Sequence, residues 1–459
     1  MNFFRSVSFL CVAGLLASIP QSTLAADTWR VGAASRIITP KEPMWMAGYG
    51  ARNAPASGKL SDLYAKALVL EDSSKTRGVF LTLDLVGIDR QLSRIIVQAI
   101  AEKLDLPSDH VVLSTSHTHS GPVVGKNLGP MHYYQLDERS QKQIDAYADQ
   151  LLVDCVELAR QANDNRIDCH VSWGNGRADF ATNRRNNKEP EVPKLRSMGD
   201  LTGPVDHDVP VLTARDLSGQ LRAILFGYAC HSTVLSGYDW SADYPGYAQQ
   251  QLEQRFPGCV ALFFAGCGAD QNPLPRRTPA LAEHYGRRLA TAVEAVLITS
   301  EMKPAAPSLT CHYAEVPLPL ADLPTSADLQ RQQSSSNKSE ATRASILLGQ
   351  IESGKALSPT YPYPISLWKI GGELNLIALG GEVVVDYSLR AKTDLPNTTW
   401  VAAYSHDVMA YIPSRRVLAE GGYEGGGAMV YYGLPTIWAP EVEEIIFKTI
   451  ANLNAKATQ

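Results

Sequence analysis

Hydrophobic and polar positions divide the chain into two kinds of segment that alternate. Short apolar runs rich in β-branched residues, each bounded by Gly, Pro or polar residues, predict strands at residues 79–83, 111–113, 224–228, 260–264 and 374–379. Between them, apolar residues recur at helical spacing. This spacing predicts helices at residues 93–103, 141–163, 247–255, 280–298 and 383–392.

The alternation of strands and helices predicts the fold class. It favours an α/β protein in which a layered, mixed or largely parallel sheet is flanked by helices. In such folds functional side chains gather just beyond the carboxyl ends of the strands. Two polar segments, 184–204 and 325–345, interrupt the pattern. We expect both to be surface loops, and the first is long enough to be a lid or binding loop.

Composition and charge narrow the class of protein. The chain has 459 residues, of which 45% are hydrophobic and 19% charged, which is ordinary for a globular protein and not typical of disorder or a coiled coil. The formal net charge is −5, and no Lys/Arg-rich run stands out. The sequence therefore lacks the basic footprint of a nucleic-acid-binding protein.

The first 25 residues predict a secretory signal peptide. A single positive charge, Arg5, precedes an apolar run at residues 6–19, and small residues follow up to Ala25. The run is too short to anchor the chain across a bilayer, and no other stretch reaches about 18 apolar residues. We expect a mature chain, residues 26–459, that is secreted or periplasmic and has no transmembrane anchor.

Export makes disulfides possible among the six remaining cysteines. Their spacing shows no zinc-knuckle pattern and does not select a pairing. Cys230 and Cys267 lie at predicted strand ends, where buried free thiols are an equally good interpretation.

Candidate catalytic groups follow three of the predicted strands. The strand that begins at Val111 leads into His117 and His119, which would share one face on extended backbone. A second strand leads to His231, and a third leads through two glycines to Glu382. Two histidines and one glutamate form a common ligand set for catalytic zinc, with one position left for water.

Simpler interpretations remain open for each of these residues. The two histidines of the His-x-His pair would also suit a solvated strand end, and a lone histidine such as His231 is more often structural. Glu382 lies at a predicted helix start, where a carboxylate also complements the helix dipole.

Seven short motifs, within a match that runs from about Val31 to Trp438, resemble the catalytic domain of the neutral/alkaline ceramidase family. They are residues 31–40 (Val-Gly-Ala-Ala-Ser-Arg-Ile-Ile-Thr-Pro), 116–122 (Ser-His-Thr-His-Ser-Gly-Pro), 183–184 (Asn-Arg), 229–231 (Ala-Cys-His), 380–382 (Gly-Gly-Glu), 410–413 (Ala-Tyr-Ile-Pro) and 421–425 (Gly-Gly-Tyr-Glu-Gly).

The resemblance implies a zinc-dependent amidohydrolase built as one large domain over residues 26–459. It implies that Zn²⁺ is held by His117, His231, Glu382 and Tyr411. It also implies that three further residues contact the substrate or the developing charge, namely His119, Arg184 and Tyr423. His119 would carry a proton to the leaving amine. Arg184 would orient a substrate hydroxyl or carbonyl, or else form a salt bridge between the loop and the body of the protein.

Two features depart from the family pattern. Gln271 stands where the family has a serine, so a serine nucleophile is not available there, whereas metal-activated water needs none. Asp270 and Asn272 beside it are expected to be structural or supporting residues. Because the chain ends at Gln459, we also expect no C-terminal β-sandwich domain, which family members that act on ceramide commonly add.

The leading hypothesis is a secreted zinc amidohydrolase that cleaves the amide of ceramide, a sphingolipid, or of a related N-acyl compound, lipid or small molecule. A zinc-dependent esterase or deacylase acting on another acyl substrate is the first alternative. A non-catalytic periplasmic binding protein that retains the pocket is the second. The intact set of metal-ligand candidates argues against the second alternative.

Overall fold

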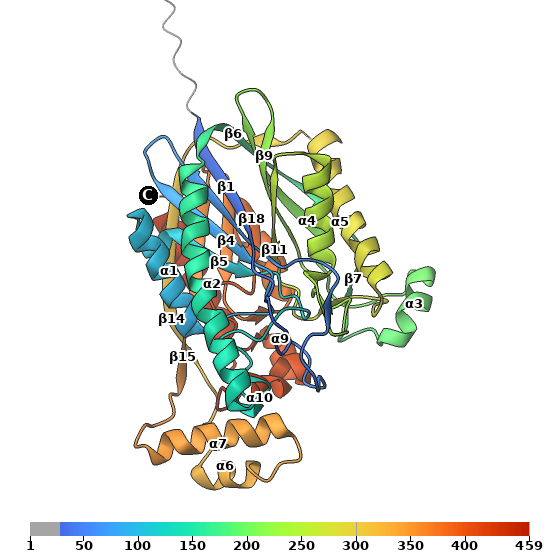
Figure 1. The fold of residues 1–459 in the computed structure, drawn as a ribbon, viewed down its shortest axis with the longest axis vertical. Coiled ribbons are helices and arrows are strands. Elements are labelled where there is room, and N and C mark those ends of the chain that lie inside the picture. Colours follow the sequence, from blue (N-terminus) through green and yellow to red (C-terminus); the bar gives the residue numbers. More distant parts are fainter. Residues whose placement is uncertain (1–27, 300, 459) are drawn as a thin grey trace, which may run out of the picture.

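The computed structural model describes residues 28–299 and 301–458. The predicted signal peptide, residues 1–25, lies outside the described residues. The described chain forms two main β-sheets with helices on both sides, so the predicted α/β fold of mixed sheets flanked by helices is confirmed (Figure 1). The hydrophobic pattern does not show whether the strands belong to one sheet or to two.

The larger sheet is mixed. Its order is β11 (Val260–Ala265), β9 (Leu221–Tyr228), β8 (Asp208–Asp216), β6 (Ile167–Arg177), β1 (Trp29–Ile37), β3 (Tyr64–Glu71), β4 (Arg77–Leu83) and β5 (Val111–Thr115), and β13 (Lys303–Pro304) pairs with β6. The pairs β9–β11 and β4–β5 are parallel, and the other pairs are antiparallel.

The larger sheet is folded at its middle. Strands β1 and β6 pair only through Trp29–Val31 and Ile167–Cys169, so the strands beyond this short ladder diverge into two halves. β3, β4 and β5 of one half lie against β11 of the other. The carboxyl ends of β5 and β9 therefore meet, although these strands stand near opposite ends of the strand order. The Ser232 hydroxyl joins them by donating to the carbonyl of Ser116 at 2.7 Å.

The second sheet packs on the inner face of the first. It consists of β14 (Leu309–Pro319), β15 (Thr360–Ile370), β16 (Leu374–Leu379) and β18 (Thr398–Ala402). Large side chains fill the interface, and the rings of Phe80 and Trp368 lie 6.1 Å apart in an edge-to-face contact. Its other face is covered by α8 (Asp386–Asp394) and α11 (Val442–Lys456).

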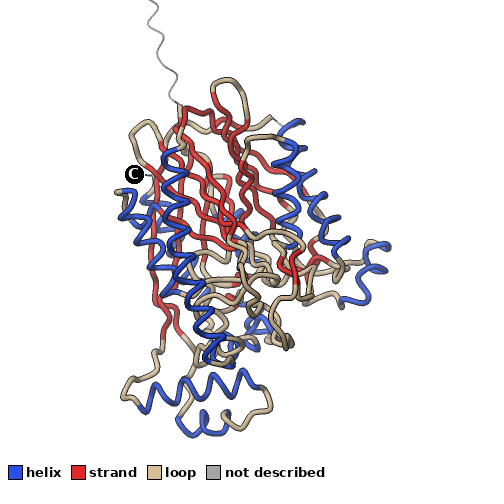
Figure 2. Tube along the Cα trace, viewed as in Figure 1, coloured by secondary structure: helices blue, strands red, loops and turns tan. Residues whose placement is uncertain are grey.

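Helices cover the outer face of each half of the larger sheet. α1 (Arg90–Leu104) and α2 (Glu138–Asp164) pack on β1, β3, β4 and β5, and α4 (Asp243–Arg255) and α5 (Pro279–Thr299) pack on β8, β9 and β11. Figure 2 shows these layers. Because both faces of β9 and β11 are buried, these strands are almost continuously apolar. Each predicted strand and helix falls on one of these elements.

Both segments predicted as surface loops contain helices. Residues 184–204 include α3 (Val192–Met198), and residues 325–345 include α6 (Ser326–Gln332) and most of α7 (Lys338–Glu352). Thr325 forms a capping box with Asp328, and the Asn337 side chain accepts from the first turn of α7. The helices α6 and α7 were not predicted because most of their residues are polar. Their few apolar side chains pack together as a separate cluster around Leu329 and Leu347.

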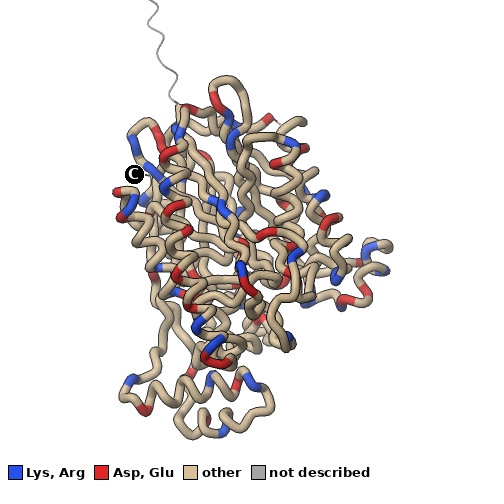
Figure 3. Tube along the Cα trace, viewed as in Figure 1, with Lys and Arg blue, Asp and Glu red and all other residues tan. Residues whose placement is uncertain are grey.

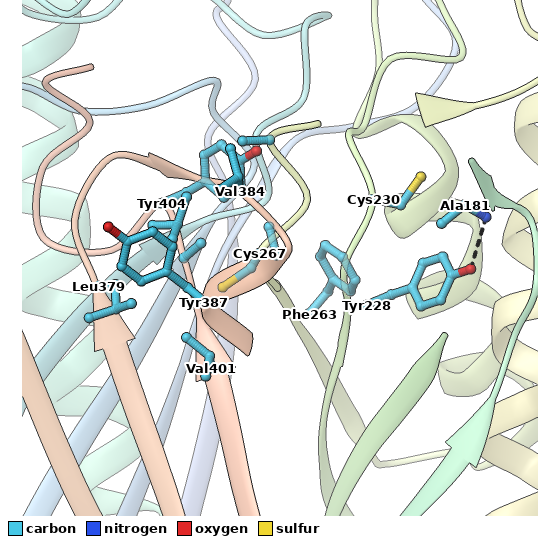
Figure 4. Close-up of a cluster of buried hydrophobic side chains, with 14 of the residues drawn as sticks. Ala181, Tyr228, Cys230, Phe263, Cys267, Leu379, Val384, Tyr387, Val401 and Tyr404 are labelled. Atoms are coloured by element: carbon cyan, nitrogen blue, oxygen red, sulfur yellow. Dashed lines mark hydrogen bonds between the residues drawn. The ribbon is translucent and has the colours of Figure 1, made fainter. Parts of the chain in front are cut away.

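Short two-strand ladders organise the loops at the end where β5 and β9 meet. β7 (Ala181–Asn183) pairs with β12 (Gln271–Pro273), β17 (Glu382–Val383) with β19 (Tyr411–Ile412), and β2 (Gly58–Lys59) with β10 (Asp239–Trp240). Tyr228, the last residue of β9, anchors β7 because its hydroxyl accepts from the amide of Ala181 at 3.0 Å, as Figure 4 shows. Two short helices, α9 (Arg415–Glu420) and α10 (Met429–Tyr432), complete this end.

Charged residues of both signs are interspersed along the trace in Figure 3. None of the helices in the described residues combines the length and apolarity that crossing a bilayer requires. The six cysteines of this part of the chain are buried free thiols, so the interpretation of Cys230 and Cys267 as unpaired holds in the structure.

Candidate metal centre

Turns at the ends of β5, β9 and β16 bring the predicted ligand residues together. His117 follows the end of β5 by two residues, and His231 follows the end of β9 by three. Glu382 follows β16 by three residues and begins β17. All three side chains are almost fully buried, with at most 3% of the side chain exposed. The predicted convergence of these residues on one crevice is present in the structure.

Four side-chain atoms face one another in this crevice. Glu382 Oε2 lies 3.1 Å from His117 Nε2 and 3.2 Å from His231 Nε2. His119 Nε2 lies 3.1 Å from His117 Nε2. The three histidines also form a group whose ligand atoms all lie within 4.8 Å of one another. His119 therefore belongs to the same cluster of side chains as the histidines predicted to be ligands.

The outer nitrogen of each predicted histidine ligand is held by the backbone. His117 Nδ1 lies 2.5 Å from the carbonyl of Val86, and His231 Nδ1 lies 2.7 Å from the carbonyl of Gly268. A carbonyl oxygen accepts only, so Nδ1 carries the proton in both rings and Nε2 presents its lone pair to the crevice. This arrangement is typical of histidines that coordinate a metal.

Glu382 provides the test of whether a cation fits. The Tyr432 hydroxyl donates to Glu382 Oε1, but Oε2 is buried and has no hydrogen-bond partner within the described residues. An unpartnered carboxylate oxygen facing two imidazole lone pairs is unfavourable unless a cation lies between them. Two imidazole nitrogens and a carboxylate oxygen are also ligands that suit Zn²⁺.

Electrostatics favour the charge states that coordinate a metal. Burial, and then the nearby Arg184, lower the pKa of His231 to about 4. Burial and the two neighbouring histidines lower the pKa of His119 well below its usual value. His119 and His231 are therefore neutral at neutral pH, with ring nitrogens free to coordinate a metal.

Two local conformations differ from those predicted. His117 adopts a left-handed backbone with φ of +57° after β5 has ended, so the two rings of His-x-His are not side by side on a strand. They meet instead in an edge contact with centroids 4.7 Å apart. Glu382 lies in β17, and α8 begins only at Asp386. The first turn of that helix therefore does not contain Glu382, and its interpretation as a helix-dipole partner is wrong.

The β17–β19 ladder explains how Tyr411 reaches the site. It pairs Glu382 directly with Tyr411, whose hydroxyl lies 3.5 Å from His231 Nε2. Tyr423 lies farther out, with 48% of the residue exposed and its ring 5.3 Å from that of Tyr411. The structure thus places Tyr411 beside the ligand candidates and Tyr423 at the mouth of the crevice.

Arg184 joins the site through three side chains. Its Nη2 donates to the Tyr411 hydroxyl at 3.1 Å, its Nη1 donates to Asn272 Oδ1 at 3.3 Å, and its Nε pairs with Glu424 Oε1 at 2.7 Å. A cavity of about 690 Å³ opens beside these groups and is also lined by His119, His231 and Tyr423. The salt-bridge role foreseen for Arg184 therefore occurs within the site and not away from it.

The segment that departs from the family pattern is structural. Asp270 accepts from the amide of Val385 at 3.0 Å and from the Asn183 side chain at 3.1 Å. The carbonyl of Gln271 accepts from the amide of His231 at 3.0 Å, and the Gln271 side chain donates to the carbonyl of Pro204 at 3.2 Å. Gln271 thus supports the turn that carries His231, and Asp270 ties the end of β7 to the segment before α8, a supporting role like the one expected for it.

Sequence reasoning missed three residues of the site. The ring of Tyr404 stacks on that of His117, with centroids 4.2 Å apart. Tyr404 comes just after the end of β18, as the histidines come just after their own strands, so its position in the sequence could have identified it as a site residue. Glu424 follows Tyr423 in the Gly-Gly-Tyr-Glu-Gly motif of residues 421–425. Tyr432, the partner of Glu382, lies in an aromatic pair that ordinary core packing would also explain.

Gly48 leaves the space that the His119 ring occupies. Its φ is +94°, and a Cβ there would lie 2.5 Å from His119 Cγ. We predict that Gly48→Ala displaces the imidazole and lowers the kcat of the reaction at this centre roughly 10- to 100-fold. Gly50→Ala is the matched control, since its Cβ would come no closer than 3.3 Å, to the flexible Met131 side chain. Full activity of the Gly48 variant in a steady-state assay would contradict this placement.

Comparison with known proteins identifies the family to which the chain belongs. The family described as neutral/alkaline non-lysosomal ceramidase, N-terminal, matches residues 29–264, more than half of the chain. The chain belongs to this family, and the resemblance seen in the sequence motifs is confirmed.

Individual relatives agree with this assignment. Neutral ceramidase A of Dictyostelium discoideum is 26% identical over 226 residues, which are 47% of this chain and 30% of that protein's length. The crystal structure of neutral ceramidase from Pseudomonas aeruginosa aligns with a TM-score of 0.69 at 19% identity, over 91% of this chain and 72% of that one. A ceramidase structure described as complexed with C2 aligns with a TM-score of 0.70 at 18% identity, over 91% of this chain and 73% of that one. At these identities the structures show the shared fold.

Proposed function

We propose that the protein is a zinc-dependent amidohydrolase that cleaves the amide of ceramide or of a related N-acyl compound. The observation that carries this proposal is the convergence of His117 Nε2, His231 Nε2 and the unpartnered Glu382 Oε2. The proposed ligands of Zn²⁺ are these three side chains together with Tyr411. Membership of the ceramidase family supports amide hydrolysis as the reaction.

Bound zinc would supply an activated water at neutral pH and polarise the carbonyl of the scissile bond. The chain's own residues do the rest. His119, 3.1 Å from His117 and neutral at rest, is placed to take a proton from water and to pass it to the leaving amine. Tyr423, at the mouth, is placed to donate to the oxyanion as charge develops there.

Arg184 orients the substrate in this proposal. Its guanidinium is fixed by Glu424 and Asn272, so it presents donors in a defined direction without a large ordering cost. It also faces the Tyr411 hydroxyl and the cavity, where a substrate carbonyl or hydroxyl would lie. Since no step needs a serine nucleophile, Gln271 is compatible with this chemistry.

The experiment combines metal analysis with a panel of substrates. We expect the purified protein to contain close to one zinc per chain, to lose activity on chelation and to regain it with Zn²⁺. We expect N-acyl substrates to be cleaved faster than O-acyl esters of the same chain length. Faster ester cleavage would favour an esterase or deacylase, and binding without any turnover would favour a binding protein. Absence of zinc from the active protein would reject the proposal.

We also propose that residues 26–459 act as one catalytic domain that is exported after removal of residues 1–25. The distribution of the site supports a single domain, because its residues come from segments as far apart as His117 and Tyr423. N-terminal sequencing of the secreted protein tests the cleavage site.

A further inference from the structure

The cavity beside the metal centre continues into a second chamber. The two spaces share Gly48, Tyr49 and Tyr423 as walls, and each has a volume of about 690 Å³. The second chamber, called here the outer chamber, lies on the side of Tyr423 and Tyr431. A substrate that places its amide at the centre has room for a further group beyond Tyr423.

The two walls of the outer chamber differ in chemistry. One wall is aromatic and apolar, made by Tyr49, Met131, Tyr423 and Tyr431. The rest of the lining comes from residues 336–339, where α7 begins, together with Gln135. These side chains are polar, and the amide of Gln135 lies 3.4 Å from the Ser339 hydroxyl. A long alkyl chain would leave this polar wall without partners, which is costly.

The side chains that line the two chambers carry a net positive charge. Each acid that lines the inner cavity is already paired: Glu189 with Arg276, Glu420 with Arg185, and Glu424 with Arg184 and Arg185. Two lysines of the walls, Lys188 in the inner cavity and Lys338 in the outer chamber, have no acidic partner among the described residues.

Tyr49, the wall shared by both chambers, adds to this field. Arg52 and Arg277 lie over its ring, 4.9 Å and 5.5 Å from the centroid. Neither arginine forms an ion pair within the described residues. Both arginines therefore place positive charge beside the wall that the two chambers share.

From these observations we propose that the substrate is an amide that also carries a negatively charged group, such as a carboxylate. Its apolar part packs on the aromatic wall, and its charged group occupies the outer chamber near Lys338. This inference rests on the proposed amide hydrolysis and specifies its substrate class. It favours an N-acyl amino acid type of compound over neutral ceramide. The charge can lie on the acyl or the amine side of the amide.

Binding tests the charge preference independently of catalysis. The probes are N-(octylsulfonyl)glycine and N-(octylsulfonyl)glycinamide, which differ only in the carboxylate and carry a sulfonamide that is not hydrolysed. By calorimetry on the zinc-containing protein we expect the charged probe to bind at least about fivefold more tightly, with a preference that falls as salt increases. Equal binding of the two probes would overturn the inference.

Two matched variants locate the charged group. Lys338→Glu should abolish the preference for the charged probe. Lys355→Glu, an equally exposed lysine beyond the far end of the 15-residue helix α7, should keep it. A preference unchanged in the Lys338 variant would overturn the placement in the outer chamber. Melting temperatures of both variants check that α6 and α7 remain folded.

Hydrolysis assays separate this inference from the proposed function. We expect higher kcat/KM for N-octanoylglycine, or for an octyl amide of a dicarboxylic acid, than for N-octanoylglycinamide and short-chain ceramide. The first two substrates place the charge on the amine and acyl sides, respectively. If ceramide has the highest kcat/KM, amide hydrolysis stands and this inference fails. If no amide is cleaved but the charged probe still binds at Lys338, the proposed function fails and the charge preference stands.

Discussion

Glu382→Gln is expected to remove the bound metal and with it the activity. Glutamine keeps the shape of the side chain, and its amide oxygen can still accept from Tyr432. It loses the negative charge of the only carboxylate that faces His117 and His231 among the described residues. Loss of a residue that only supports a ligand costs about 10- to 100-fold in metal affinity, so loss of a ligand should cost more than about 100-fold. Titration with a competing zinc chelator measures this change.

Glu373→Gln is the matched control for this variant. Glu373 is exposed and immediately precedes β16, the strand whose other end leads to Glu382. The same chemical change there should leave zinc content and kcat unchanged. A Glu382 variant that retains one zinc per chain with wild-type affinity would show that this carboxylate is not a ligand. The cluster of His117, His119 and His231 would then be the metal site on its own.

The positions of the main strands and helices along the chain could be predicted because their patterns of apolar residues are clear. Both faces of β9 and β11 are buried, so each appears in the sequence as an apolar run, and the long helices have one buried stripe each. The fold of the larger sheet could not be predicted. It depends on the three-residue pairing of β1 with β6, which leaves no mark in the hydrophobic pattern.

The site was predictable where chemistry follows a strand, and less so where it depends on turns. His117, His231 and Glu382 were found because each comes directly after an apolar run. The left-handed backbone of His117 carries no signature, since such a conformation is unusual for a residue other than glycine. Tyr411 was implied by the family resemblance, and the reason for its position is the ladder with Glu382, which joins segments about thirty residues apart.

Glu424 explains how the loop that carries Tyr423 is tied to the metal centre. The residue is only 4% exposed, and its carboxylate pairs with Arg184 Nε at 2.7 Å and with Arg185 Nη1 at 2.6 Å. Arg184 in turn donates to the Tyr411 hydroxyl. Burial would raise the pKa of Glu424, but Arg184 and Arg185 outweigh it and keep the pKa below its usual value. The carboxylate is therefore ionised and holds both arginines in place.

Glu424→Gln is expected to lower kcat about 10- to 100-fold while one zinc per chain is retained. The neutral amide cannot pair with two guanidinium groups, so Arg184 would no longer be fixed against Tyr411, and small displacements in an active site cost this much. Glu420→Gln is the matched control, because Glu420 also pairs with Arg185 but is more exposed and does not contact Arg184. The Glu420 variant should change kcat less than about threefold.

Steady-state kinetics separate kcat from KM. Thermal unfolding shows how much of the loss of activity comes from lower stability, since removing one partner of a buried ion pair is destabilising. A Glu424 variant with normal kcat would mean that Arg184 is positioned by Tyr411 and Asn272 alone, and that the loop of Tyr423 acts independently of the metal centre.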